Sequence, residues 1–352
     1  MPFTLEGGIN FRYTNVGLTQ AINVLPNAYG RIQRMGLFVD KPITTTISTI
    51  RRREGKLAVL SSKPRGAEPD AVENATEDEI LFRVPHFPWT NSLGPDDVQD
   101  VFAFREGPLS AKSVDEALNE ILADDRIRAD QTLEFMRMGS LKGQIKDGSG
   151  NVKLDLFDTF GISKKTVYFN LGNANTNVPA KCAEITNHIE DHLQGEEMSE
   201  VRCLVSSQFM EMLLAHASVE KYATSGGQQA MEILRQARLN AEEGVFVREY
   251  HINGVTFETY RGKAPLKTGA AEPYIEAGKG HAFPLGTRNV FRTHLAPAHA
   301  MSAVNQPGVQ IWAHAAPLDG DQGILLSYQM NALPLCARPE LLVEVDEAAP
   351  PA

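Results

Sequence analysis

The feature that most constrains this chain is the stretch of residues 43–89, which is too long, too extended and too polar for the interior of a compact domain. Residues 43–50 alternate in side-chain type, residues 56–60 continue a β-rich pattern, and residues 79–84 form a second such run before a pair of prolines. Residues 61–78 contain almost no bulky apolar side chain, which predicts a solvated tip. A lone two-stranded ribbon is marginally stable in water, so we expect an arm that lies on a further surface.

The predicted arm is also a charge dipole. Residues 51–65 carry six Lys or Arg against one Glu, and residues 66–79 carry six Asp or Glu and no base. A solvated surface loop would explain such a run. An arm that crosses a second copy of the same protein and docks by complementary charge would explain it as well. For the second explanation, the candidate intersubunit contacts are Arg51, Arg52, Arg53, Lys56, Arg65, Glu68, Asp70, Glu73, Glu77 and Asp78.

Composition limits the class of protein. The 352 residues are 42% hydrophobic, enough for one large or two moderate cores, and the formal net charge is −10. Dedicated nucleic-acid binders need a basic surface, so an acidic chain argues against that class, although it could enclose nucleic acid without gripping it. No apolar run approaches a membrane span, and the start of the chain lacks signal-peptide features, so we expect a cytoplasm-like compartment and no membrane contact. Three widely spaced cysteines predict buried thiols rather than disulfides or a zinc ribbon.

Periodicity predicts an α+β fold. Residues 1–42 show little periodic structure. Residues 113–138 show the strongest helical pattern, with a capping box formed by Ser113 and Glu116 and one apolar stripe. Arg137 near the end of this predicted helix suits the helix dipole. Further predicted elements are hairpins at 145–157 and 245–260, strands at 167–169, 201–205, 323–328 and 341–345, and helices at 179–193, 208–216 and 228–239, with a loop-rich interval at 262–286. Strands and helices do not alternate in a βαβ pattern, so a doubly wound sheet is not expected.

Three groups of residues are candidate reactive sites. His188 and His192 are spaced to share one helix face and could bind a metal with Glu184 or Asp191, which would suit a soluble metal-dependent enzyme. However, no HExxH pattern is present, and such pairs arise by chance. Residues 278–281 resemble a phosphate loop only superficially, and a structural turn is the better interpretation.

Ser206, Ser207 and Cys203 have no G-x-S-x-G setting and no evident partner base. We therefore expect no catalytic site and no cofactor. Assembly explains the arm better than catalysis does.

Several short motifs resemble those of a known family. They are residues 52–57 with residues 65–66 in the arm, residues 271–286, and residues 328–335 with Pro339, Glu340 and Val343. Their order and spacing resemble the major capsid proteins of tailed bacteriophages, the family of the phage lambda head protein E.

The resemblance implies the Hong Kong 97-like capsid fold, an α+β fold built around an arm, a loop and two domains. Mapped onto this sequence, it gives an N-terminal arm at 1–42, an extended loop at 43–88, a peripheral domain at 89–178 plus 319–352 with a spine helix at 113–138, and an axial domain at 179–318.

The resemblance also implies a structural subunit, not an enzyme, that forms hexamers and pentamers of an icosahedral shell. The implied partners are other copies of the chain, a portal, a scaffold and a decoration or cement protein, with double-stranded DNA enclosed without sequence-specific binding. The implied location is the virion, after assembly in the cytoplasm of a bacterial host.

Overall fold

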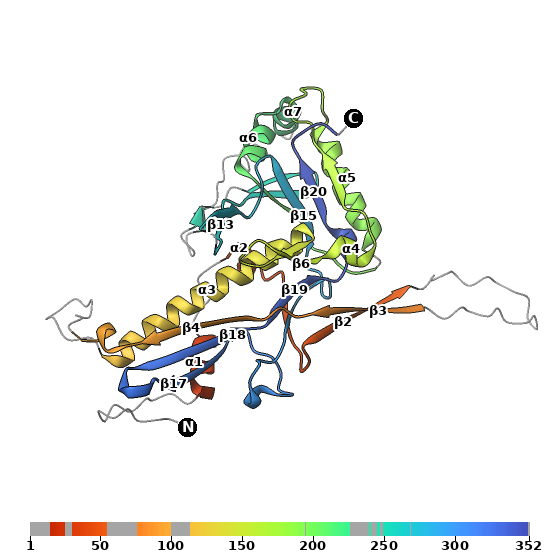
Figure 1. Ribbon diagram of the computed structural model, residues 1–352. Coiled ribbons are helices and arrows are strands. Elements are labelled where there is room, and N and C mark those ends of the chain that lie inside the picture. The colour runs from red at the N-terminus through yellow and green to blue at the C-terminus, as the bar shows by residue number, and fades with distance from the viewer. Residues whose placement is uncertain are drawn as a thin grey trace, which may run out of the picture.

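A computed structural model describes residues 15–24, 30–54, 76–99, 113–193, 195–225, 239–240, 245–246, 249–267 and 269–350. Figure 1 shows an elongated molecule: a lobe built on one large sheet, a long helix running beneath it, and a thin ribbon that projects beyond both.

The long helix α3, Val114–Lys142, is the central element. Its start is as predicted, because the Ser113 hydroxyl accepts a hydrogen bond from the Glu116 amide at 3.2 Å and the Glu116 carboxylate accepts one from the Ser113 amide at 3.0 Å. Its end is later than the predicted residue 138, since the helix runs on to Lys142 and stops at Gly143, a left-handed cap with φ 84°. Position 139, inside the helix, suits a glycine because a Cβ there would sit 2.7 Å from the Gln144 carbonyl oxygen.

A three-stranded antiparallel sheet lies along α3, in the order β17 (Trp312–Pro317), β18 (Ile324–Met330) and β4 (Phe87–Leu93). The Trp89 ring stacks on the Tyr328 ring with centroids 5.3 Å apart. The proline expected to end the arm, Pro88, is instead a residue of β4, which it can join because β4 is an edge strand.

Helix α1, Asn15–Val24, packs against β17, which corrects the expectation of little periodic structure before residue 43. The Thr19 hydroxyl donates to the Ala313 carbonyl and accepts from the Ala313 amide, both at 3.0 Å. Leu18 and Ile22 of α1 are fully buried. The same segment continues through α2 (Arg31–Arg34) and β1 (Val39–Pro42).

The lobe holds a six-stranded mixed sheet in the order β11-β12-β8-β15-β20-β7. Its strands are β11 (Glu249–Ile252), β12 (Val255–Thr259), β8 (Glu200–Val205), β15 (Lys279–Leu285), β20 (Val343–Asp346) and β7 (Lys165–Tyr168). The predicted Asn-Gly hairpin is confirmed between β11 and β12, with positive φ at Asn253 and Gly254.

Strand β15 is a correction. Residues 262–286 were predicted to be loop-rich, yet they contain this central strand and the hairpin of β13 (Lys263–Pro265) and β14 (Ala271–Pro273). The structural turn predicted at residues 278–281 is limited to its beginning, since Gly278 has φ 75° and β15 starts at Lys279.

Helices flank this sheet at α5 (Val178–His192), α6 (Ser207–Ala215) and α7 (Ala217–Ser225), and Phe169, Phe209 and Phe257 form an aromatic cluster with centroids 5.3–6.2 Å apart. The first two helices were predicted. Of the helix predicted at 228–239, only its last residue is described, and Leu239 pairs in the short hairpin of β9 (Leu239–Asn240) and β10 (Val245–Phe246).

The remaining elements join the parts. A sheet of β1, β16 (Phe291–Leu295) and β19 (Ala332–Cys336) lies beside α3. The predicted Asp-Gly hairpin is confirmed and consists of β5 (Gln144–Lys146) and β6 (Val152–Asp155). The short helix α4 (Leu156–Phe160) follows it. The 3-10 turns are η1 (Pro95–Asp97), η2 (Met301–Ala303), η3 (Asp319–Asp321) and η4 (Pro339–Leu341). The fold is α+β, as predicted, and the three cysteines are buried and free.

None of the helices in the described part of the chain is both long enough and apolar enough to cross a membrane.

Candidate functional site

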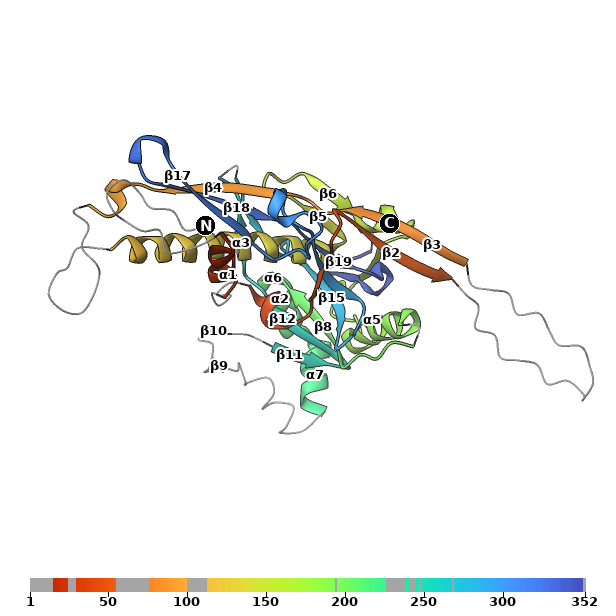
Figure 2. The same cartoon turned by 90° about the horizontal axis from the view of Figure 1, so that it is seen from below.

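The predicted arm is a two-stranded ribbon of β2 (Ile47–Glu54) and β3 (Thr76–Arg83). Figures 1 and 2 show it projecting away from the body, at the end opposite the β17–β18 hairpin. One face of its base is buried, because Ser48 is 4% exposed and Phe82 is 2% exposed, with the Phe82 ring stacked on Phe160 at 6.0 Å. The other face is open: Ile47 is 48% exposed and Leu81 is 65% exposed. The ribbon thus presents apolar surface that the described part of its own chain does not cover.

The ribbon register places opposite charges across from one another. Arg51 pairs with Glu79, position 52 with Asp78, and position 53 with Glu77. Directly opposite residues in a ladder have Cβ atoms about 4.5–5.5 Å apart. The register therefore places basic positions of one strand across from acidic positions of the other, which the sequence-based proposal of a simple dipole did not foresee. The candidates Lys56, Arg65, Glu68, Asp70 and Glu73 lie outside the described residues.

The ribbon base is fixed to the body by main-chain bonds. The Ile43 amide donates to the Leu295 carbonyl at 2.8 Å, and the Ile43 carbonyl accepts from the Gly308 amide at 3.0 Å. The Val84 amide donates to the Thr46 carbonyl at 3.0 Å. The two legs leave the body through β1 and β4, each of which is paired in a sheet. The ribbon is therefore held at its base in a defined direction.

A buried carboxylate on α3 fixes the segment that leads into the ribbon. Glu134 is 1% exposed and accepts hydrogen bonds from the amides of Ile32 at 2.8 Å and Gln33 at 3.3 Å, and from the Tyr260 hydroxyl at 3.0 Å. Burial raises the pKa of this carboxyl, and the amide and hydroxyl bonds partly oppose that rise. Gly30, at φ 105°, passes so close to the Glu134 carboxylate that a Cβ there would collide with it. One side chain thus joins the spine helix, α2 and the sheet lobe.

Arg31 of α2 extends this junction into the six-stranded sheet. It shares the Glu258 carboxylate, which is 1% exposed, with Arg202, whose guanidinium lies 2.9 Å away. Both arginines also reach Glu249, at 3.4 Å and 3.2 Å. Arg202 also bonds Glu200 at 2.8 Å, so two cations and three carboxylates meet in a partly buried place.

Two further ion pairs involve buried arginines of α3. Arg126 bonds Asp130 at 3.1 Å, with both side chains buried. Arg137 reaches Asp40 of β1 at 3.5 Å and lies over the Phe38 ring at 5.7 Å. Burial lowers the pKa of Arg137, and the nearby carboxylates oppose that fall. The sequence suggested that Arg137 serves the helix dipole. The structure instead uses it as a buried tie to the strand before the ribbon.

The histidine pair does not form a metal site with the described residues. The His188 and His192 rings lie 4.3 Å apart, but His188 Nε2 contacts the Glu340 carbonyl at 3.1 Å and His192 Nδ1 contacts the His188 carbonyl at 2.7 Å. Burial lowers the pKa of His188, and the neighbouring His192 adds to that effect. Glu184 instead pairs with Lys165 and Lys181. Within the described ranges, no group of three metal-ligating side chains is close enough to hold an ion.

The other reactive candidates have structural roles. The Ser206 hydroxyl caps α6 by accepting from the Phe209 amide at 3.2 Å, and it also accepts from the Gly278 amide at 3.0 Å. Ser207 accepts from Arg261 Nε at 2.7 Å. Burial raises the pKa of Cys203 well above its ordinary value, so this thiol is not a nucleophile.

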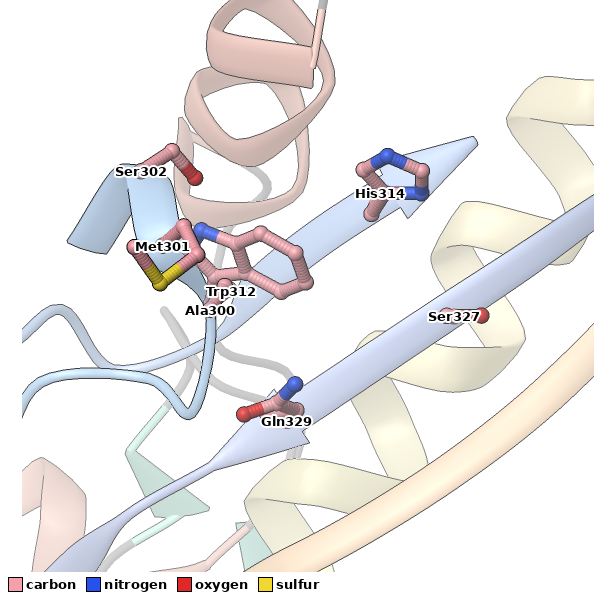
Figure 3. A pocket seen from close by; sticks show the side chains of 7 residues that line it. All are labelled: Ala300, Met301, Ser302, Trp312, His314, Ser327 and Gln329. Carbon is pink, nitrogen blue, oxygen red and sulfur yellow. The ribbon is translucent and has the colours of Figure 1, made fainter. Parts of the chain in front are cut away.

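A shallow, open pocket of about 500 Å³ lies on the β17–β18 face, shown in Figure 3. Trp312 and His314 stack there with ring centroids 5.7 Å apart, and Met301 beside them is 92% exposed. His314 faces Ser327 across the ladder, but no hydrogen bond joins these two side chains among the contacts of the described residues. This pocket is an open feature of the surface.

Comparisons with known proteins agree on one family. A family model described as phage major capsid protein E matches residues 14–346. The major capsid protein of Salmonella phage Felix O1 is 30% identical over 361 residues, which cover 95% of this chain and 96% of that protein. The major capsid protein of Pseudomonas phage KPP10 is 26% identical over 346 residues, with 95% and 96% covered.

Solved structures show the same fold. A prophage capsid protein from E. coli CFT073 superposes with a TM-score of 0.61 at 12% identity, covering 96% of this chain and 99% of that one. The mature capsid of bacteriophage PhiM1 gives a TM-score of 0.52 at 14% identity, covering 90% and 86%. At these identities the likeness concerns the fold alone.

Proposed function

The chain belongs to the phage major capsid protein E family, and from this premise we propose that its copies form the hexamers and pentamers of an icosahedral shell around double-stranded DNA. The protein is a bacteriophage major capsid protein that self-assembles into the capsomers of the virion shell. Its fold is Hong Kong 97-like, and it is a structural subunit, not an enzyme.

The observation that carries the proposal is the ribbon with one open face. A two-stranded ribbon is marginally stable by itself, and the exposed Ile47 and Leu81 would gain by contact with another surface. Because the base of the ribbon is fixed in direction, the contact would be directional, and directional contacts between identical subunits close into rings or shells. The ribbon of one copy would lie on the body of the next.

We assign the parts of the subunit as follows. Residues 1–42 form the N-terminal arm, 43–88 the extended loop, 89–178 with 319–352 the peripheral domain, and 179–318 the axial domain. Helix α3 is bonded to the first of these parts through Glu134, Arg126 and Arg137. The two assigned domains share one sheet, since β7 and β20 of the peripheral range complete the sheet of β8, β12 and β15. Shared strands would make them move as one body.

The net charge of the chain supports a shell that encloses DNA without binding it tightly. With a net charge of −10, the subunit would repel rather than trap a packaged DNA duplex. A portal, a scaffold and a decoration or cement protein are the further partners we propose. We also propose that assembly takes place in the cytoplasm of the host bacterium.

Removing the ribbon tests the proposal most directly. Deletion of residues 51–78 with a short Gly-Ser bridge should leave a folded subunit, as judged by circular dichroism, that forms no closed particles in negative-stain electron microscopy. Wild-type protein prepared in parallel should form them. Normal shells from the deletion variant would refute the role of the ribbon.

Exchanging two charges of the arm tests whether these charges act on a neighbouring copy or only within the ribbon itself. Arg52→Asp and Asp78→Arg each put like charges at two positions that the register places opposite one another, whereas the double exchange keeps opposite charges there with their direction reversed. If a neighbouring copy reads these charges, the double variant should assemble as poorly as the single ones. Rescue of particle yield by the double variant would assign the charges to the ribbon itself and would leave the apolar face as the contact.

A further inference from the structure

A second feature of the molecule is a small charged cavity that the assembly proposal does not use. It encloses about 200 Å³ where the last turn of α3 meets β5, β14, β15 and β20. Cavities for drug-sized ligands are usually larger, at about 300–1,000 Å³, so this one suits a ligand of a few atoms. It lies between the long helix and the central strands of the sheet lobe.

The cavity is lined by more positive than negative side chains. Four lysines and three glutamates face it, together with a histidine: Lys142, Lys146, Lys164, Lys279, Glu272, Glu276, Glu344 and His281. Burial, aided by the surrounding lysines, lowers the pKa of His281 well below its ordinary value, so this imidazole is neutral at pH 7. The lining therefore carries one net positive charge.

Three of the lysines are matched by carboxylates. Lys146 bonds Glu272 at 3.0 Å, and Lys164 bonds Glu344. Lys279 bonds Glu276 at 3.1 Å and lies 3.5 Å from Glu344. All three glutamates are thus already engaged.

Lys142 is the unmatched charge. It belongs to the last turn of α3, where the helix dipole favours a cation. Within the described part of the chain, its ammonium has no carboxylate at ion-pair distance and no hydrogen-bond acceptor. Burial lowers its pKa, while Glu276 and Glu272 at longer range oppose the fall. A half-buried ammonium with three unused donors in a cavity of positive charge is stabilised by an anion.

We propose that this cavity binds a small oxyanion with the size and charge of inorganic phosphate, held by Lys142 together with the neighbouring lysines. Lysine is a common phosphate ligand, and charge-assisted hydrogen bonds are about twice as strong as neutral ones. The anion would complete the lining and tie the end of α3 to β15. Its effect would be to stiffen the junction between the helix and the sheet lobe.

Thermal unfolding of the full-length protein tests the proposal. Phosphate should raise the unfolding temperature in a saturable way, sulfate should do the same, and sodium chloride at equal ionic strength should not. Lys142→Met keeps the length of the side chain and should weaken phosphate binding at least about tenfold, the equivalent of one charged hydrogen bond. The matched control is Lys153→Met, an exposed lysine on the adjacent hairpin that pairs with Asp147, which should bind as the wild type does.

Two results would overturn the proposal. One is the lack of a saturable phosphate effect on the wild type, and the other is an equal effect in the Lys142→Met variant. If that variant does not fold, phosphorus NMR titration of the wild type decides alone, because unchanged phosphate linewidths in the presence of protein would exclude the site. Particle formation is not the readout, so failure here leaves the assembly proposal unaffected.

Discussion

The ribbon β2–β3 and the helix α3 are both rich in charge, but they place it differently. Along α3, Arg126, Asp130, Glu134 and Arg137 are at most 5% exposed. Arg126, Glu134 and Arg137 bond to groups outside the helix, and Asp130 bonds Arg126. On the ribbon, the described charged side chains are at the surface beside an exposed Leu81.

The difference indicates two kinds of stabilisation within one chain. The buried charges of α3 have their ionic or hydrogen-bond partners inside the subunit, so they stabilise the subunit in isolation. In the proposed assembly, a second copy would cover the open face of the ribbon. Variants in α3 should therefore change the stability of the isolated subunit, whereas variants on the ribbon's open face should change assembly.

A large loss of subunit stability is expected from Arg126→Met. This change leaves the Asp130 carboxylate buried without its cation, since Asp130 Oδ2 bonds Arg126 and its Oδ1 atom has no hydrogen-bond partner among the described residues. Removing one partner of a buried pair costs about 3–5 kcal/mol of unfolding free energy. Urea denaturation of dissociated subunits measures it.

A nearby arginine provides the control for that change. Arg128 is 66% exposed and lies 3.7 Å from Asp125, a buried carboxylate that keeps its hydrogen bonds from Trp89 and Asn91, so Arg128→Met should cost less than about 1 kcal/mol. Equal losses at positions 126 and 128 would contradict the view that α3 gains its rigidity from buried pairs.

A smaller loss is expected from Gly139→Ala. The added Cβ would lie 2.7 Å from the Gln144 carbonyl oxygen and 3.1 Å from the Ile145 Cα, both backbone atoms that cannot move alone. Overpacking of this kind costs about 1–3 kcal/mol, although alanine returns part of it through its better helix propensity. The same measurement on Gly148→Ala should show little change, because nothing lies within 4 Å of a Cβ there.

The parts of the fold that sequence predicted are those with local signals. Ser113 and Glu116 specify the start of α3, and Asn253-Gly254 specifies a type I′ turn, because each pattern acts over four residues or fewer. The position of the ribbon could be predicted in the same way from its β-rich legs and polar tip.

The parts that sequence could not predict depend on distant partners. β15 contains Gly280 and Pro284 and lacks alternation, because it is buried on both faces in the centre of a sheet. Proline is tolerated at position 284 because the pairing of β15 with β20 ends at Ala282, so no hydrogen bond to β20 is lost when the amide hydrogen is missing. Arg137 was assigned to the helix dipole because its real partner, Asp40, is 97 residues away in sequence.

A third variant, Glu134→Gln, should change the pH dependence of stability. Burial raises the pKa of Glu134 above its ordinary value of 4.5. Because the pKa of Glu134 is raised in the folded state, its protonated carboxyl contributes to the free energy of unfolding. This contribution is complete below pH 4.5 and is lost as the pH rises through the folded-state pKa. Glutamine does not titrate, so the difference in unfolding free energy between wild type and variant should change with pH from 4.5 upward. The slope can reach about 1.4 kcal/mol per pH unit.

Glu184→Gln is the control of opposite sign. Although burial acts in the other direction, the hydrogen bonds from Lys165 and Lys181 lower the pKa of Glu184. Its contribution is therefore present above pH 4.5 and lost as the pH falls through the folded-state value. A pH-independent difference for Glu134→Gln would show that this carboxylate is not the titrating tie between α3 and α2.

The smallest effect on the isolated subunit is expected from Leu81→Asp. Leu81 is 65% exposed, and surface substitutions away from special features stay within about 0.5 kcal/mol. Its neighbour Phe82 lies on the opposite face, 2% exposed and stacked on Phe160, so Phe82→Ala should cost about 3–5 kcal/mol. Two adjacent residues thus separate the two roles of the ribbon: one anchors it to its own subunit, and the other faces outward.

Assembly should reverse that order. Leu81→Asp places a charge on the face that a second copy would cover, and desolvating it there opposes contact, so particle yield in electron microscopy should fall sharply while urea denaturation is unchanged. Leu81→Met keeps the surface apolar and should assemble as the wild type does. Normal particles from Leu81→Asp would mean that the open face stays in solvent, and the ribbon would then have to dock through its charges or its tip.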